Sequence, residues 1–146
     1  MTTVEQPRRA EPWLHPAIQV RDSAIEGRGL FASTALPAGL VVIELGGHLV
    51  GTEELMALID SSTTYVDTFS VGPDVHVVLP SNATAHYGNH SCEPNLAIHE
   101  LYSLITKRPI VADEELTIDY ATITGAPSER VPCHCGAPNC RGSVEL

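Results

Sequence analysis

Four cysteines constrain the fold of this chain more than any other feature. Three of them lie close together near the C-terminus, and the fourth, Cys92, lies far upstream. A tetrahedral zinc site takes four thiolate ligands, and the C-terminal group cannot close such a site alone. The sequence therefore predicts one structural zinc ion that pins the end of the chain to its middle, with the ligands Cys92, Cys133, Cys135 and Cys140.

The cysteines allow two other interpretations. They could be buried or free thiols, and Cys92 could be a nucleophile activated by the nearby His90. We expect a histidine two residues away in a tight loop to point elsewhere. Four sulfurs also satisfy one metal ion fully and leave no position for water, so the predicted site is structural and not catalytic.

The composition favours a single domain without a membrane segment. The chain has 146 residues, and no apolar run reaches the ~18 residues of a membrane-spanning helix. The polar segment 1–11 lacks the apolar stretch of a secretory signal, so we expect a cytoplasmic protein, or a nuclear one in a eukaryote. In such compartments clustered cysteines are more often metal ligands than disulfides.

The charge balance bears on the partners of the protein. The formal net charge is −10, from 18 acidic and 8 basic residues. Phosphate binding needs a basic surface, so we expect no direct contact with nucleic acid. The charge fits a partner rich in Lys or Arg, and ordinary solubility would explain it too. The oligomeric state stays open.

Short apolar runs separated by Gly and Pro predict a mostly β domain. Strands are expected at 18–20, 30–32, 40–45, 69–71, 75–79, 96–98, 101–106 and 116–120, with a loop over 122–132. One helix is expected over 52–59. Thr52 can cap it, two glutamates occupy its first turn, and apolar residues at 55, 58 and 59 share one face.

Two segments, one polar and one rich in glycine, contain groups that suit a binding site. The segment 89–95 (NHSCEPN) is too polar and too close to proline for regular helix. Taken alone, it could be a solvent loop with Asx turns or the lining of a ligand pocket. The segment 27–29 (GRG) is most often a turn. It also permits a ligand to approach the backbone closely, with Arg28 able to stack or pair.

The segment 114–120 (EELTIDY) combines acidic residues with a terminal tyrosine. Tyr120 could be an ordinary core aromatic with its hydroxyl at the rim. Glu114 and Glu115 could suggest the paired carboxylates of a glycosidase. Adjacent residues on a strand face opposite sides, however, so these two cannot flank one bond.

Taken together and in this order, these segments resemble the motifs of the SET-domain lysine methyltransferases. The similar segments are 27–32 (GRGLFA) to the N-terminal cofactor loop, 89–95 to the central motif, 114–120 to the C-terminal motif and 133–142 (CHCGAPNCRG) to the post-SET zinc segment. The central motif matches residue for residue. The resemblance spans about 18–142, nearly the whole chain.

The resemblance implies a mainly β fold of the SET-domain (β-clip) type. Several small sheets surround a pseudoknot, in which the strand of the last motif threads under the loop of the central motif. The implied division is a flexible N-terminal segment over 1–14, a SET domain over 15–124 and a post-SET zinc-binding segment over 125–146.

The resemblance also implies an enzyme that transfers a methyl group from S-adenosylmethionine to lysine side chains of a basic protein, histone or histone-like. By resemblance, the cofactor-binding residues are Arg28, Gly29, Tyr87, Asn89 and His90. Tyr120 would border the transferred methyl group. A closed four-cysteine zinc site agrees with this, because methyl transfer needs no metal.

Some positions depart from the family pattern. Many relatives carry an aromatic residue where this chain has Ile118, and the residues before Asn89 also differ. These changes motivate two alternatives: a methyltransferase for a small or carrier-bound amine, and a catalytically weak SET module that binds a partner. Because Ile118 has no hydroxyl, we expect more than one methyl to be added if the substrate is a lysine.

Overall fold

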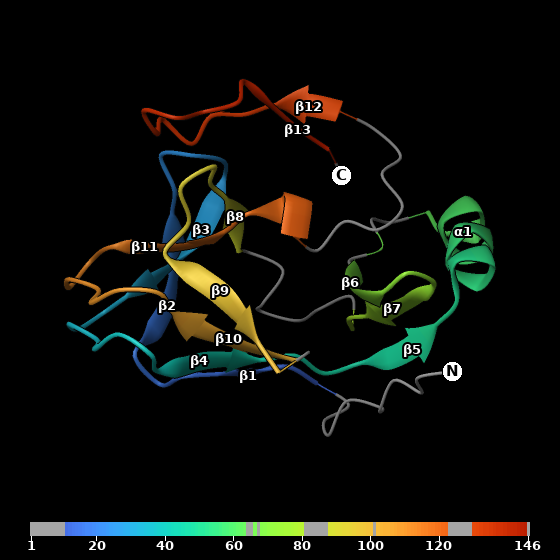
Figure 1. Cartoon of the computed structure of the whole chain (residues 1–146), viewed down its shortest axis with the longest axis horizontal. Helices are drawn as coiled ribbons and strands as arrows, with labels where there is room; N and C mark the ends of the chain where they lie inside the picture. The colour runs from blue at the N-terminus through green and yellow to red at the C-terminus, as the bar shows by residue number, and fades with distance from the viewer. Residues whose placement is uncertain are drawn as a thin grey trace.

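The computed structural model describes residues 11–63, 66, 68–80, 88–100, 102–122 and 130–145. These residues form four small sheets, a helix at one end and a short 3-10 turn, so the expected mainly β class is confirmed (Figure 1). None of their helices is long and apolar enough to cross a membrane.

The first sheet is antiparallel and has the strand order β1-β4-β10-β9. Its strands are β1 (Trp13–Leu14), β4 (Val41–Glu44), β9 (Leu96–His99) and β10 (Ser103–Thr106). Strands β9 and β10 form a hairpin, with Ser103 opposite His99, and β10 continues onto β4. The N–H of Lys107, which follows β10, donates to the backbone oxygen of Asn95 at 2.8 Å and joins this sheet to the polar segment that precedes β9.

The second sheet carries the motif residues and has the order β2-β3-β11-β8. Its strands are β2 (Ile18–Asp22), β3 (Arg28–Ala32), β8 (Asn89–His90) and β11 (Glu115–Ile118). Strand β11 is antiparallel to β3 and parallel to β8, with Thr117 opposite Asn89 and Ile118 opposite His90. Residues far apart in the sequence are thereby brought into adjacent strands.

The third sheet, of order β5-β7-β6, packs against the helix. Its strands are β5 (His48–Val50), β6 (Thr68–Gly72) and β7 (Val75–Val78), and the helix is α1 (Thr52–Ser61). The expected apolar face is confirmed: Leu55 is buried, and Leu58 and Ile59 pack beside it.

The expected cap of this helix was wrong. Gly51 occupies the cap position, and Thr52 is the first helical residue. The backbone N–H of Thr52 donates instead to Asp74 at 2.9 Å, and its hydroxyl bonds the ring of His76 at 2.8 Å. A carboxylate from the β6–β7 turn thus satisfies the helix start, which local sequence spacing did not indicate.

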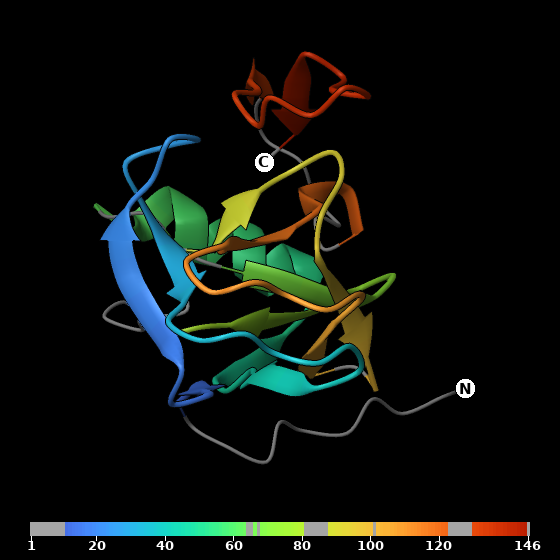
Figure 2. The ribbon, with the colours of Figure 1, turned by 90° about the vertical axis from the view of Figure 1, so that its left-hand side faces the viewer.

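The C-terminal segment forms a separate hairpin of β12 (Arg130–Pro132) and β13 (Ser143–Glu145). Figures 1 and 2 both place it above the second sheet, near the end where β8 and β11 lie. The 3-10 turn η2 (Tyr120–Thr122) lies between the two and contacts β13. The end of the chain is thereby docked onto its middle.

The main hydrophobic core joins the first three sheets. Leu30, Val42, Val77 and Leu116 come from four different strands of these sheets, and each is completely buried. Burial of a side chain of this size contributes about 1.5–3 kcal/mol. The core therefore holds β3 and β11 firmly, and these strands position the residues of the site.

Candidate functional site

The site begins at the hairpin between β2 and β3. Gly27 has a φ of 43°, in the left-handed region that favours glycine. Gly29 follows in β3, and a Cβ there would lie 2.1 Å from a carboxylate oxygen of Glu115 and 3.0 Å from the amide nitrogen of Asn89. Only glycine leaves room for these two side chains beneath the hairpin. The side chain of Arg28 is exposed.

Asn89 ties this hairpin to β8. Its amide nitrogen Nδ2 lies 3.1 Å from the carbonyl oxygens of Glu26 and Arg28, 3.1 Å from the Ser23 hydroxyl and 2.8 Å from Glu115 Oε2. Asn89 is only 9% exposed. The backbone of the glycine segment is thus held against β8 and β11 by one buried side chain.

His90 joins β8 to the turn that carries Tyr120. The backbone N–H of Tyr120 donates to His90 Nδ1 at 3.0 Å, so Nδ1 is an acceptor and the ring proton is on Nε2. Burial lowers the pKa of His90 below its ordinary value, although the nearby Asp119 opposes this. The ring is therefore neutral at physiological pH, in the tautomer that the tyrosine backbone selects.

The phenol of Tyr120 lies beside this histidine. The ring centroids are 5.2 Å apart, and the hydroxyl donates to the carbonyl oxygen of Gly88 at 2.5 Å. Strand β11 ends at Ile118, so the expectation that Tyr120 belongs to the strand was wrong. The chain turns into η2 at this point because the Tyr120 N–H bonds the histidine ring and not a neighbouring strand.

Asn95 closes the crossing between the central motif and β11. Its Nδ2 donates to the backbone oxygen of Glu115 at 2.7 Å and to Glu114 Oε2 at 3.1 Å, and its Oδ1 accepts from the Thr117 N–H at 2.8 Å. The Asn95 side chain thus bonds a backbone oxygen and a backbone N–H of β11, as a neighbouring strand would. The loop of residues 91–95 is thereby fixed beside the strand.

The four cysteines meet above β8. Their sulfur atoms all lie within 4.8 Å of one another, and those of Cys92 and Cys133 are 3.9 Å apart. Four sulfurs at ~2.3 Å from a tetrahedral zinc ion would be separated by about 3.8 Å. The grouping of Cys92 with the C-terminal three is confirmed, and the spacing fits one zinc ion.

The donor set also carries the charge that a cation needs. Burial raises the pKa of Cys135, but hydrogen bonds from the backbone of Cys92 and Ala137 and from neighbouring thiols lower it, to about 6. The surrounding hydrogen-bond donors therefore favour the thiolate form of Cys135. A thiolate is the form that binds zinc.

One expectation about this region was wrong. His90 was expected to point away from Cys92, yet its Nε2 lies 3.4 Å from the Cys92 sulfur. The two-residue strand β8 ends at His90, and the chain bends at Cys92, which brings the sulfur back beside the ring. Because the Nε2 proton points to a sulfur that lies among three others, the pair is a contact with the cysteine cluster and not an isolated nucleophile with its base.

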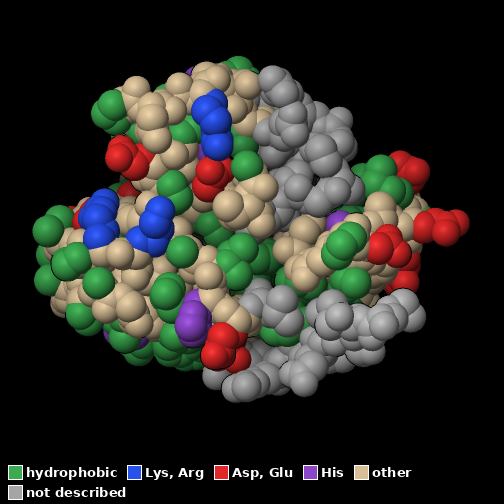
Figure 3. Space-filling view, viewed as in Figure 1, with side chains coloured by type: hydrophobic (Ala, Val, Ile, Leu, Met, Phe, Trp, Pro, Cys, Tyr) green, Lys and Arg blue, Asp and Glu red, His purple; other side chains and the backbone are tan. Residues whose placement is uncertain are grey.

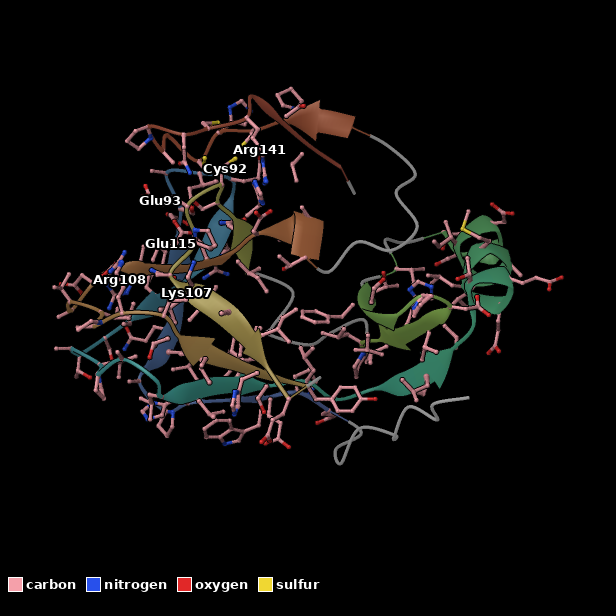
Figure 4. All side chains as sticks on the ribbon, viewed as in Figure 1. Cys92, Glu93, Lys107, Arg108, Glu115 and Arg141 are labelled. Carbon is pink, nitrogen blue, oxygen red and sulfur yellow. The ribbon has the colours of Figure 1, made fainter. Side chains whose placement is uncertain are left out.

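Arg141 links the cysteine cluster to the turn of Tyr120. Its backbone N–H donates to the Cys92 sulfur at 3.3 Å, and its guanidinium donates to Asp119 Oδ1 at 2.7 Å. Burial raises the pKa of Asp119, but the hydrogen bonds from Arg141 and from the backbone of Ala121, together with the nearby positive charge, outweigh this and hold the pKa below its usual value. Figure 4 shows Cys92 and Arg141 side by side at the top of the second sheet.

The structure brings together most of the residues that the sequence indicated. Gly29, Asn89, His90 and Tyr120 lie around one end of the second sheet, with the cysteines directly above. Tyr87 lies outside the described residues. Some roles could not be read from the sequence: those of Ser23, Asn95, Glu115 and the Arg141–Asp119 pair. All of these residues but Ser23 stand in or beside the motifs.

Comparison with known proteins places the chain in a family. A model of the SET domain matches residues 27–121, and the chain belongs to this family. Histone-lysine N-methyltransferase 2B of Homo sapiens is 35% identical over 86% of this chain. The chain spans only 5% of the length of that relative.

Two solved structures share the fold. The methyltransferase domain of human histone-lysine N-methyltransferase SETMAR aligns with a TM-score of 0.69 and 24% identity, over 89% of this chain and 57% of that one. KRYPTONITE, in complex with mCHG DNA and SAH, aligns with a TM-score of 0.66 and 26% identity, over 86% of this chain and 28% of that one. The expected SET-type fold is confirmed.

Proposed function

We propose that this protein is an S-adenosylmethionine-dependent methyltransferase that acts on lysine side chains of a basic protein, histone or histone-like. One observation carries the proposal: Asn89, His90 and Tyr120, from two separate motifs, meet beside the Gly29 hairpin in a SET-family chain. The names of relatives support the substrate class, since the relative cited above is a histone-lysine methyltransferase.

We assign the cofactor to the end of the second sheet. The backbone of Arg28 and Gly29 would line one side of it, and Asn89 and His90 the other. The SAH (S-adenosylhomocysteine) bound in a structure of the same fold supports this assignment, because SAH is the product that remains after methyl transfer. When bound, S-adenosylmethionine supplies a methyl group on a positively charged sulfur that leaves by in-line displacement.

Tyr120 would orient the amine that receives the methyl group. Its hydroxyl proton is directed at the Gly88 carbonyl, so the oxygen meets an amine N–H as a hydrogen-bond acceptor. The hydrogen bond to the Gly88 carbonyl exists only while the phenol keeps its proton, which argues against a role of Tyr120 as general base. An amine held this way presents its lone pair in one direction, and alignment of this kind is the main contribution of such a site.

A lysine amine must be neutral to attack. Its ordinary pKa is ~10.4, and burial in a narrow channel beside a positive charge lowers it. Ile118 is buried at the end of β11 and offers an apolar wall without a hydroxyl. With no hydroxyl to hold a water or an amine proton, the site should accept a methylated amine again, so we expect more than one methyl group to be added.

The four cysteines would hold one structural zinc ion. Its role is to dock the C-terminal hairpin above β8 through Cys92, and the guanidinium of Arg141 lies where it offsets the negative charge of the thiolates. The metal takes no part in the methyl transfer, since four sulfurs leave no open position.

The charge distribution supports a basic substrate. No Lys or Arg occurs between Arg28 and Lys107. Figure 3 shows acidic side chains over α1 at one end, where Glu53 and Glu54 are exposed, and basic side chains confined to the other part of that face. Complementary charge of this kind guides association with a basic segment and raises its rate.

The decisive experiment is incubation of the protein with S-adenosylmethionine and a panel of basic proteins, histones included, followed by mass spectrometry. Added masses of one or more methyl groups on lysine residues are the expected result. Methylation of a small amine in place of every protein would move the substrate to a different class. Binding of S-adenosylhomocysteine without any transfer would indicate a binding module.

A further inference from the structure

The carboxylate of Glu115 lies in an unusual setting beneath the glycine hairpin. It is partly buried, and both of its oxygens accept from the Ser23 hydroxyl, at 2.7 and 2.9 Å. Oε2 also accepts from Asn89 at 2.8 Å. No Lys, Arg or His of the described residues forms a salt bridge with it, whereas the adjacent Glu114 is paired with Arg108. Figure 4 shows that Glu115 lies below Cys92, at the second sheet.

This carboxylate determines which way the Asn89 amide faces. Four acceptors lie within 3.1 Å of Nδ2, and three of them, two carbonyl oxygens and the Glu115 carboxylate, have no proton to donate. A reversed amide would place Oδ1 against these oxygens, and the contacts would be repulsive. The NH2 group is therefore fixed on this side.

Fixing the NH2 group leaves Oδ1 as the atom that faces outward. It accepts no hydrogen bond from the described residues, although Asn89 as a whole is 91% buried. None of the described buried side-chain oxygens or nitrogens lacks a partner, so this oxygen is open to the solvent. An acceptor held open beside an uncompensated carboxylate favours a ligand group that is both a donor and positively charged.

We propose that Glu115 is a positioning and specificity-determining residue, which locks the Asn89 amide and supplies the negative charge that selects a ligand carrying an ammonium group. The inference rests on the proposed function, in which that ligand is S-adenosylmethionine, and its ammonium is the α-amino group of the methionine part. Ser23 contributes by donating to both oxygens of the carboxylate and accepting from the amide.

Calorimetry with two probes tests this. The probes are S-adenosylhomocysteine and its deaminated analogue, in which hydrogen replaces the ammonium group. The wild-type protein should bind the first more tightly. Glu115→Gln removes the charge and offers a competing NH2 group to the Asn89 amide. The ratio of the Kd of the deaminated analogue to the Kd of S-adenosylhomocysteine should therefore fall by roughly tenfold or more, the size of a lost charge-assisted hydrogen bond.

The control is Asp22→Asn, which removes one negative charge from an exposed position on β2 in the same hairpin. It should leave the ratio unchanged. Ser23→Ala provides a second route if the Gln variant does not fold, and it should lower the ratio in the same direction by a smaller factor.

The outcomes separate this proposal from the proposed function. Failure of the folded wild-type protein to bind S-adenosylhomocysteine would overturn both. Wild-type discrimination that persists in Glu115→Gln, or equal weakening of both probes in that variant, would overturn the role of Glu115 alone. An unchanged ratio in Ser23→Ala would also count against the proposal that Glu115 fixes the orientation of the Asn89 amide.

Discussion

Asn95 should be among the residues on which the stability of the fold most depends. It is 3% exposed, and it makes three hydrogen bonds across the point where β11 passes the central motif. Asn95→Ala removes all three. The N–H of the buried Thr117 and the backbone oxygen of Glu115 then lose their partners, while Glu114 keeps its bond to Arg108.

The expected cost follows from these two backbone groups. An unsatisfied buried group costs about 1–3 kcal/mol, so two cost about 2–6 kcal/mol. Water can enter the space that the amide leaves and satisfy one of them in part, so we expect a loss of about 3 kcal/mol. Domains are stable by only about 5–15 kcal/mol, so this loss is a large fraction of the total.

Urea unfolding at fixed zinc concentration measures the loss. With a slope of about 2 kcal/mol per molar, the midpoint should fall by about 1.5 M. Asn139→Ala is the matched control: its exposed side chain makes one long bond of 3.4 Å, and its loss should cost less than about 0.5 kcal/mol.

The isosteric variant Asn95→Asp separates the donor role of this side chain from its acceptor role. It keeps the acceptor for the Thr117 N–H but turns a carboxylate oxygen toward the Glu115 carbonyl and the Glu114 carboxylate. At neutral pH it should destabilise at least as much as the alanine variant. If both variants unfold at a midpoint within about 0.2 M of the wild-type midpoint, the assigned role of Asn95 is refuted.

Four further expectations concern the proposed metal site, the proposed catalytic residue and the ion pairs. Cys92→Ser should lower the zinc content well below one ion per chain and weaken S-adenosylhomocysteine binding; full zinc occupancy by elemental analysis would contradict the ligand assignment. Tyr120→Phe should reduce turnover roughly 100-fold or more with little change in cofactor affinity, and full activity in this variant would remove its catalytic role. A double-mutant cycle on Arg141 and Asp119, read by urea unfolding, should give a coupling of about 0.5–1 kcal/mol, because the Arg141 side chain is 47% exposed; zero coupling would count against the link. Burial raises the pKa of Glu114, yet its hydrogen bonds hold the pKa below the ordinary 4.5. The ionised Glu114 therefore stabilises the fold above its ordinary pKa of 4.5, and this stabilisation is lost as the pH falls through the lowered pKa. The difference in unfolding free energy between Glu114→Gln and wild type should vanish in acid.

Much of the local structure could be predicted from the sequence. Alternation and turn residues indicated most strands, and the spacing of Leu55, Leu58 and Ile59 indicated the one helix and its buried face. These signals are local, because strand and helix periods are written into neighbouring residues. The predicted end of β11 and the predicted cap of α1 were wrong. In both places a backbone N–H donates to a side chain that is distant in the sequence: Tyr120 to His90, and Thr52 to Asp74.

The sequence by itself determined which chemical groups the site contains: four cysteines, the number that one zinc ion would take, and the motif residues Gly29, Asn89, His90 and Tyr120 in their family order. Only the tertiary structure decided how they are oriented. The Asn89 amide is set by Glu115, 26 residues away, and the Arg141 guanidinium reaches Asp119, 22 residues away. The physical reason is that hydrogen-bond direction depends on which strands lie side by side. The parallel pairing of β8 with β11 joins residues that are distant in the sequence, and burial of the common hydrophobic core stabilises it.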